Sequence, residues 1–226
     1  MTEHILISPN TRGRDFVVGD IHGHIDLFWD ALSYEGFDPK QDRVFSVGDL
    51  IDRGPDSLAC LKLLDKRWFY AVRGNHEQMM IDWAYGDGFD SWKHNFGGWT
   101  ESMTAAQIAT WVERLGNLPI SMTVEGDDFS VGICHAEPSG FNWDKMISDS
   151  NCFQQMMWGR KLLRGEVDTR PVKGVDITVH GHTPVPNVRR IGNRHFIDTG
   201  AGIGNYLTVR NMENLFREYR DYAALL

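Results

Sequence analysis

Short runs of apolar residues recur along this chain, and each run ends in glycine or in polar residues. Runs of this length between turn-forming residues are typical of buried strands that lead into loops. The pattern therefore predicts strands over residues 16–18, 44–47, 69–72, 129–134 and 177–179. Nearer the end of the chain it predicts further β-structure over residues 190–197 and 206–210.

Leu, Phe and Trp at helical spacing separate the first three of these strands. The spacing covers residues 26–32 and 56–64, and Asp56 or Ser57 is well placed to cap the second helix. Strands that alternate with helices predict an α/β fold. In open α/β sheets the functional residues gather at the carboxyl ends of the strands.

Residues 79–118 have a different character, because they are rich in Trp, Met and Gly and carry a clear helical pattern over 105–115. We interpret this stretch as a helical excursion that flanks the site, and not as a separate domain. We expect its aromatic residues to belong to the core and not to stack on a ligand. These residues are Trp83, Trp92, Phe96 and Trp99.

The last part of the chain, residues 211–222, allows two interpretations. Apolar residues at helical spacing would make it a helix with this stripe: Leu215, Phe216, Tyr219, Tyr222 and Ala223. Residues 211–214 also resemble a hairpin turn that leads into a strand over 215–219. We favour the hairpin.

Length and composition indicate one catalytic domain of generous size, which we place over residues 1–226. A hydrophobic fraction of 42% is sufficient for one substantial core. The formal net charge of −8 and the sequence pI of about 5.5 argue against a nucleic-acid partner, because nucleic-acid-binding domains usually carry a basic face. Carboxylates that bind metal ions would explain part of this acidity.

The cysteines and the apolar runs predict where the protein works. Cys60, Cys134 and Cys152 are scattered and odd in number, which disfavours a disulfide framework and favours a reducing cytoplasm. Residues 1–9 lack the pattern of a signal peptide, and no apolar run reaches membrane-spanning length. We therefore expect a cytoplasmic protein with no membrane partner. The oligomeric state stays open, and a monomer is compatible with the sequence.

Side chains that bind metal ions follow the predicted strands. Asp20 and His22 are two residues apart and point to the same side of an extended segment. Asp49 follows the next strand directly after a glycine, which allows close approach, and its two carboxylate oxygens could bridge two ions. One ion would be held by Asp20, His22 and Asp49. The other ion would be held by Asp49, Asn75, His135 and His182.

This ligand set indicates both the metal and the chemistry. Imidazole, carboxylate and amide ligands without cysteine suit Mn, Fe or Zn. Two such ions about 3.5–4 Å apart can hold a hydroxide between them and clamp the attacking and leaving oxygens of phosphate ester hydrolysis.

Each ligand has an ordinary alternative, because a lone Gly-Asp is usually a turn and a lone His is usually a hydrogen-bonded structural residue. The agreement among the segments favours the ligand interpretation. His180 could compete with His182, but the Gly-His-Thr-Pro context favours His182. The other histidines without such a context are expected to be structural or surface residues: His4, His24, His94 and His195.

Catalysis also needs a proton donor and a clamp for the phosphoryl charge. His76 lies beside a predicted ligand and is the candidate general acid, and Asp52 could orient it. Arg53 and Arg160 are the candidate phosphate clamps, with surface salt bridges as the alternative for each. Glu77 could either support the site or start a helix.

Extended motifs in this sequence resemble the calcineurin-like metallophosphoesterases. Within the phosphoprotein phosphatase superfamily they look most like the bacteriophage lambda protein phosphatase and small bacterial serine/threonine phosphatases. The resemblance extends from about residue 14 to 208 and rests on residues 17–23, 46–49, 52–55, 73–80, 97–99, 133–136, 181–184 and 197–201.

The resemblance implies a central mixed β-sandwich flanked by helices on both sides. It also implies two Mn-type ions and direct attack by a metal-bound hydroxide without a phosphoenzyme. Matching positions carry the same roles as those argued above for the six metal ligands, for His76, for Arg53 and for Arg160.

We therefore predict a metal-dependent phosphatase that acts on phosphoserine and phosphothreonine, with phosphotyrosine as a further option, in protein or peptide substrates. A symmetrical dinucleoside tetraphosphatase would share all the metal motifs and is the competing enzymatic interpretation. A protein-binding scaffold without catalysis is the competing interpretation from another class. The complete ligand set, together with His76 and Arg53, argues against the scaffold.

Overall fold

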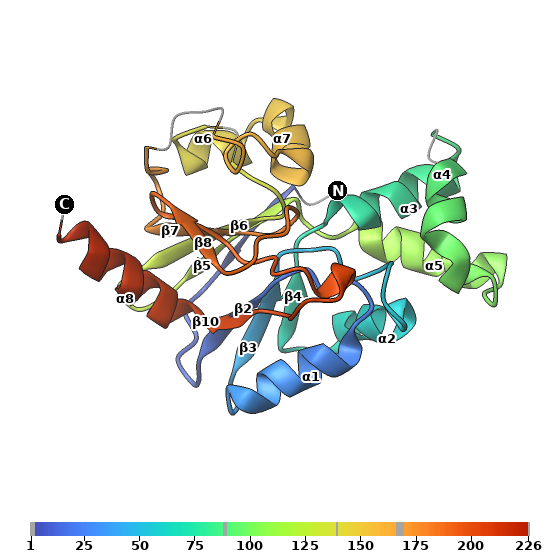
Figure 1. Cartoon of the computed structure of the whole chain (residues 1–226), viewed down its shortest axis with the longest axis horizontal. Helices are drawn as coiled ribbons and strands as arrows, with labels where there is room; N and C mark the ends of the chain where they lie inside the picture. The colour runs from blue at the N-terminus through green and yellow to red at the C-terminus, as the bar shows by residue number, and fades with distance from the viewer. Residues whose placement is uncertain (1–2, 88–89, 139, 166–169, 226) are drawn as a thin grey trace.

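Two β-sheets pack face to face in the computed structural model, which describes residues 3–87, 90–138, 140–165 and 170–225 (Figure 1). The six-stranded sheet has the order β1 (His4–Ile7), β5 (Ser121–Glu125), β6 (Ser130–Cys134), β7 (Ile177–His180), β9 (Arg194–Phe196) and β8 (Arg189–Ile191). The four-stranded sheet has the order β10 (Val209–Asn211), β2 (Asp15–Val18), β3 (Arg43–Ser46) and β4 (Phe69–Ala71).

Helices lie on both sides of this sandwich (Figure 1). The α-helices are α1 (Ile25–Tyr34), α2 (Ser57–Leu61), α3 (Asn75–Tyr85), α4 (Asp90–Asn95), α5 (Ala105–Gly116), α6 (Trp143–Ile147), α7 (Phe153–Trp158) and α8 (Met212–Ala223). Short 3-10 helices are η1 (Lys62–Asp65), η2 (Gly97–Thr100), η3 (Ser150–Cys152) and η4 (Ala201–Ile203). In the described part of the chain, none of the helices has the length and apolarity needed to cross a membrane.

The alternation of side chains along β2 explains the layers. Val17 points into the core between the two sheets, whereas Phe16 and Val18 point to the opposite face and pack with Phe28 and Leu32 of α1. Because strands of this sheet are apolar on both faces, they read as continuous apolar runs. The mixed β-sandwich with flanking helices that the resemblance implied is therefore confirmed.

The carboxyl ends of several strands meet at one edge of the sandwich. β2, β3 and β4 run parallel to one another in the four-stranded sheet. In the six-stranded sheet, β6, β7 and β9 also run parallel. Loops that follow these strands consequently emerge close together, which brings residues from distant parts of the sequence into one place.

Most of the predicted elements are confirmed, with different bounds. The five predicted strands correspond to β2, β3, β4, β6 and β7, and residues 190–197 contain a hairpin of β8 and β9. Asp56, and not Ser57, caps α2, because its carboxylate accepts a hydrogen bond from the backbone N–H of Ala59 at 2.8 Å. The excursion over 79–118 is helical as predicted, although its residues 88 and 89 lie outside the described part.

The hairpin favoured for residues 211–222 is wrong, because this segment forms α8. The side chain of Asn211 accepts a hydrogen bond from the backbone N–H of Asn214 at 3.0 Å and thereby caps the helix. Met212 and Leu215 are buried in the core between the sheets, where Phe216 also packs. Asn211 therefore starts a helix and not a hairpin turn, and burial of the apolar stripe holds it in place.

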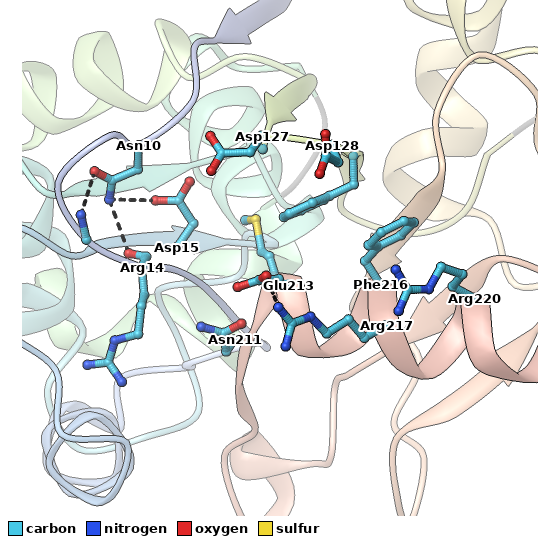
Figure 2. Close-up of a pocket in the computed structure, with 14 residues that line it drawn as sticks. Asn10, Arg14, Asp15, Asp127, Asp128, Asn211, Glu213, Phe216, Arg217 and Arg220 are labelled. Carbon is cyan, nitrogen blue, oxygen red and sulfur yellow. Dashed lines mark hydrogen bonds and ion pairs between the residues drawn. The ribbon is translucent and has the colours of Figure 1, made fainter.

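A pocket of about 250 Å³ opens where β2 begins, at the opposite end of this strand from Asp20 (Figure 2). Phe129 and Phe216 stack in its wall with ring centroids 5.1 Å apart. Arg217 pairs with Glu213 in the same wall, and Asp15 pairs with Arg43 at 2.6 Å. The pocket therefore lies away from the predicted metal ligands.

Candidate metal centre

The predicted ligands lie just beyond the carboxyl ends of five strands. Asp20 follows β2, Asp49 follows β3, Asn75 opens α3 after β4, His135 follows β6 and His182 follows β7. All of these side chains are buried. The structure thus places together residues that are up to 162 positions apart, the separation between Asp20 and His182.

Backbone strain is concentrated at this edge. Among the described residues, every non-glycine residue with a positive φ is a predicted site residue: His22 (45°), Asp49 (53°), Asp52 (75°), Arg53 (66°) and His182 (69°). Residues other than glycine rarely adopt a backbone conformation with positive φ, because it costs on the order of 1 kcal/mol or more per residue. Strain of this kind persists where the surrounding structure imposes it, and it is a recognised mark of functional sites.

Two groups of side chains could each hold a cation. The first group is His22, Asp49 and His76, and the second group is Asp49, His135 and His182. Within each group the potential ligand atoms lie within 4.8 Å of one another, and Asp49 belongs to both. This shared carboxylate is the arrangement expected of a bridging ligand.

Hydrogen bonds orient the imidazoles of the first and second groups. His22 Nδ1 faces the carbonyl oxygen of Ile51 at 2.8 Å, and His135 Nδ1 faces that of Val47 at 2.8 Å. A ring nitrogen that faces a carbonyl carries the proton, so the lone pair of Nε2 points to the centre in both rings. Histidine ligands are commonly oriented in this way by a hydrogen bond from the other ring nitrogen.

Electron-rich atoms converge around Asn75. His135 Nε2 lies 2.9 Å and His182 Nδ1 lies 2.7 Å from Asn75 Oδ1, and His135 Nε2 lies 3.4 Å from Asp49 Oδ1. A neutral His135 carries its proton on Nδ1, toward Val47, so its Nε2 lone pair faces the oxygens of Asn75 and Asp49, and a positive charge between these atoms would stabilise the contact. Although burial opposes it, the Asp49 carboxylate raises the pKa of His135, which is the direction expected where positive charge is favoured. The donors therefore fit a divalent cation.

Asp20 supplies a second sign that a cation belongs here. Its Oδ2 accepts a hydrogen bond from the backbone N–H of His182 at 2.9 Å, while its buried Oδ1 has no hydrogen-bond partner among the described residues. Burial, and then the carboxylates of Asp198 and Asp49, raise the pKa of Asp20 well above its usual value. Carboxylates buried together are unfavourable unless cations compensate their charge.

Burial keeps two of the candidate ligands neutral. It lowers the pKa of His22 to about 3 and that of His182 to about 3, with His135 adding to the effect on His182. Neutral imidazoles are the form that binds metal ions. His180, the competitor of His182, lies apart from both groups, since its ring contacts the Thr178 hydroxyl at 2.7 Å and the Cys134 carbonyl at 3.2 Å.

Among the predicted catalytic residues, His76 belongs to the first group, and Asp52 and Arg53 contact His76. His76 Nδ1 is 2.7 Å from Asp52 Oδ2, and both side chains are buried. Arg53 points its guanidinium at two imidazoles, with NH1 2.8 Å from His22 Nε2 and NH2 3.1 Å from His76 Nε2. Arg160 lies on the other side, where its charge contributes to lowering the pKa of His182.

Glu77 both supports the site and stands at the start of a helix, the two roles that the sequence left open. It lies in the first turn of α3, and its buried carboxylate accepts hydrogen bonds from three backbone N–H groups. These belong to Asp49 at 2.9 Å, Leu50 at 2.8 Å and Gly74 at 2.8 Å. Glu77 thus ties the loop after β3 to the loop after β4.

Sequence reasoning missed three residues at this edge. Asp198 is buried with its Oδ2 unpartnered among the described residues, and its carboxylate contributes to the raised pKa of Asp20. Its only sequence signal was its place in one of the family-like motifs. Trp92 lies in the core and Trp99 packs against it, as predicted, but the sequence did not reveal that their indole N–H groups donate hydrogen bonds to Asp52.

The sandwich, the ligand-bearing strand ends and the shared Asp49 define a metal-dependent phosphoesterase. Comparison with known proteins names the family. The chain matches the model of the calcineurin-like phosphoesterase family over residues 16–223, and it belongs to that family.

Similar proteins are known from bacteria. The chain is 39% identical to serine/threonine-protein phosphatase 1 of Salmonella typhimurium, over 88% of this chain and 91% of the relative. It is 34% identical to serine/threonine-protein phosphatase 2 of Escherichia coli, over 88% of this chain and 93% of the relative. A crystal structure of a candidate diadenosine tetraphosphatase shares the fold, with a TM-score of 0.70, 20% identity and 95% of each chain covered.

Proposed function

We propose that this protein is a metal-dependent phosphatase that hydrolyses phosphoserine and phosphothreonine in proteins or peptides, with phosphotyrosine as a further substrate. The observation that carries the proposal is the His76–Asp52 pair, 2.7 Å apart, within a cluster of two groups that could hold cations and that share Asp49. Both bacterial relatives described above bear the name of a serine/threonine-protein phosphatase and match over most of the chain.

We propose two divalent ions as cofactors, Mn²⁺ first, with Fe or Zn as alternatives. Asp20, His22 and Asp49 would hold one ion. Asp49, Asn75, His135 and His182 would hold the other. Ions bound there would polarise the phosphoryl oxygens and lower the pKa of bound water. Oxygen and imidazole donors without a thiolate support a metal of this type.

In the proposed reaction the oxygen of a water molecule forms a bond to phosphorus while the bond from phosphorus to the serine or threonine oxygen breaks. His76, whose Nδ1 is held by Asp52, would give a proton from Nε2 to the leaving oxygen once the Arg53 N–H that faces Nε2 in the structure turns to the phosphoryl group. Arg53 and Arg160 would bind the phosphoryl oxygens from the His22 and the His182 sides. The products are the free hydroxyl and phosphate.

The competing activity is a symmetrical dinucleoside tetraphosphatase. The structural similarity to a candidate enzyme of this kind stands at 20% identity and supports the fold alone. A catalytically silent scaffold is the competing interpretation of another class. The buried, hydrogen-bonded His76–Asp52 pair argues against it, because a scaffold has no use for such a pair.

A substrate panel tests the proposal. With added Mn²⁺, the purified protein should hydrolyse a phosphoserine peptide and p-nitrophenyl phosphate faster than diadenosine tetraphosphate. Asp20→Asn and His76→Asn should abolish turnover of the peptide, and His94→Asn, at an exposed histidine of α4, is the matched control. Preferred turnover of the dinucleotide would support the tetraphosphatase, and no turnover with fewer than about two ions per chain would support the scaffold.

We further propose that residues 1–226 act as one catalytic domain in the cytoplasm, with no nucleic-acid or membrane partner. The cysteines support a reducing compartment, since Cys60, Cys134 and Cys152 are all free thiols. The oligomeric state stays open, and a monomer is compatible with the sequence. Measuring the mass of the purified protein by light scattering determines this state directly.

A further inference from the structure

Two tryptophans of the excursion hold the buried carboxylate of Asp52. Trp92 Nε1 donates a hydrogen bond to Oδ2 at 2.7 Å, and Trp99 Nε1 donates one to Oδ1 at 2.8 Å. His76 Nδ1 also contacts Oδ2, at 2.7 Å. Among the described residues, the carboxylate therefore has a donor on each oxygen besides the histidine that it orients.

A third aromatic residue of the same segment contacts the histidine. The ring of Phe96 lies 5.0 Å from that of His76, at an angle of 70° between the ring planes. Trp92 lies in α4 and Trp99 lies in η2, and Phe96 occupies the turn between these two helices. One short segment thus contacts both members of the pair.

We propose that Trp92 and Trp99 are positioning residues for the proton donor of the reaction. They fix the plane of the Asp52 carboxylate, which in turn fixes the His76 ring, and Phe96 limits the rotation of that ring. This inference rests on the proposed phosphatase activity and concerns residues that do not touch the substrate.

The local packing is built for this arrangement. A side chain at Gly97 would meet the Trp92 ring at 2.9 Å, so the turn between the two tryptophans needs a residue without a β-carbon. The Thr100 hydroxyl donates to the Gly97 carbonyl at 2.6 Å, and Lys93 donates to the same carbonyl at 3.0 Å. These bonds fix the turn that sets the distance between the two indoles.

The geometry explains why indole rings are suitable hydrogen-bond donors to the Asp52 carboxylate. Asp52 is fully buried, and a carboxylate without water needs a hydrogen bond on each oxygen. An indole is a donor only, so it cannot compete with Asp52 for the proton of His76 Nδ1. The rings are also bulky enough to exclude water from the pair, and the Trp92 and Trp99 centroids lie 6.5 Å apart, edge to face.

The inference predicts a dependence on the leaving group. A phosphoserine peptide or phenyl phosphate releases a strongly basic oxygen that needs the proton of His76. The oxygen of p-nitrophenyl phosphate is weakly basic and leaves without that proton. Loss of positioning should therefore slow the first two substrates and spare the third, whereas a general loss of structure should slow all of them alike.

The experiment measures kcat and KM for phenyl phosphate and p-nitrophenyl phosphate in Mn²⁺-loaded Trp92→Phe and Trp99→Phe. Each variant keeps an aromatic ring and loses the N–H. We expect kcat for phenyl phosphate to fall about 10-fold, kcat for p-nitrophenyl phosphate to stay within about 2-fold, and both KM values to stay unchanged. Trp83→Phe is the matched control, because the Trp83 ring packs 5.2 Å from Trp92 in the same cluster.

Equal losses with both substrates, no loss with either, or a leaving-group effect in Trp83→Phe would overturn the inference. Wild-type turnover in the same assay separates this outcome from failure of the proposed activity. If Trp92→Phe or Trp99→Phe folds poorly, an NMR measurement on Asp52→Asn tests the hydrogen bonds between the indoles and Asp52 instead. Two of the eight indole N–H signals of the ¹⁵N-labelled wild type should move in Asp52→Asn, and unchanged signals would also overturn the inference.

Discussion

The α-carbon of Gly202 lies so close to the imidazole of His22 that a methyl group at residue 202 would sit 2.4 Å from Cδ2 of the ring. The same methyl group would lie 3.0 Å from the Arg53 side chain. The backbone of Gly202 does not have a positive φ, so a substitution there tests space alone. The short helix η4 therefore packs directly against His22, one of the candidate metal ligands.

Gly202→Ala should displace the His22 ring without unfolding the protein. We expect metal affinity to fall about 10-fold, with a similar loss in kcat/KM that added Mn²⁺ partly restores. Titration of Mn²⁺ by calorimetry and by activity measures both. Ile203→Ala, in the same turn but at a side chain 62% exposed, should behave as the wild type. Wild-type metal affinity in Gly202→Ala would show that the ring has room to move.

Arg53 offers a test of stored backbone strain, because its φ is 66°. Arg53→Gly and Arg53→Ala both remove the guanidinium and should lose the same phosphatase activity. Glycine tolerates this φ and alanine does not, so the glycine variant should be more stable by about 1 kcal/mol in free energy of unfolding. Urea denaturation of the two variants measures the difference. Equal stability would mean that the loop relaxes once the arginine is gone.

Asp20→Asn should have opposite effects on the metal-free and the metal-loaded protein. Burial and the neighbouring Asp198 and Asp49 carboxylates raise the pKa of Asp20, so the folded state binds its proton more tightly than the unfolded state. Metal-free wild type consequently loses stability as the pH rises above the ordinary pKa of aspartate. At pH 7 with a chelator, we expect the variant to be more stable by about 2 kcal/mol.

Added Mn²⁺ should reverse this order. The wild type gains stability from the bound ions, whereas Asp20→Asn has lost one ligand and gains less. Thermal unfolding with chelator and with Mn²⁺ gives all four values. A variant that is less stable than the wild type in chelator would refute the repulsion among the carboxylates.

His195 should make the protein sensitive to acid independently of the metal centre. Burial lowers the pKa of this β9 histidine to about 4, so the unfolded state binds a proton near pH 6.5 and the folded state does not. Stability should therefore fall between pH 6.5 and 4, by about 3 kcal/mol at most from this residue. His195→Gln should lose less stability over that range, as measured by urea denaturation at several pH values. An unchanged pH slope would rule this contribution out.

The strands that carry the site could be predicted because they are apolar on both faces and end abruptly in polar residues. Val17 and Val18 face different cores, so the run before Asp20 is apolar without alternation, and its short length between turn-forming residues identifies it as a strand. In a parallel sheet the carboxyl ends of the strands lie at one edge, and for this reason ligands from distant segments could be grouped from the sequence alone.

Other features depend on partners that the sequence pattern does not reveal. Trp92 and Trp99 look like ordinary core residues, since the carboxylate that binds their indoles lies 40 and 47 residues earlier. Asp198 follows a short strand with little local signal. α8 was mistaken for a hairpin because Asn211 suits a turn as well as a helix cap, and only the sandwich core that receives Leu215 decides between them.

The pairing of β10 with β2 has a consequence for how the centre is assembled. These strands come from opposite parts of the chain, and Val209 lies opposite Val18, just before the loop that carries Asp20 and His22. We expect contacts between such distant segments to form late in folding, because closing a long loop is entropically unfavourable. We expect the ions to load onto a nearly finished fold, so that metal supply governs activation of the protein more than its folding.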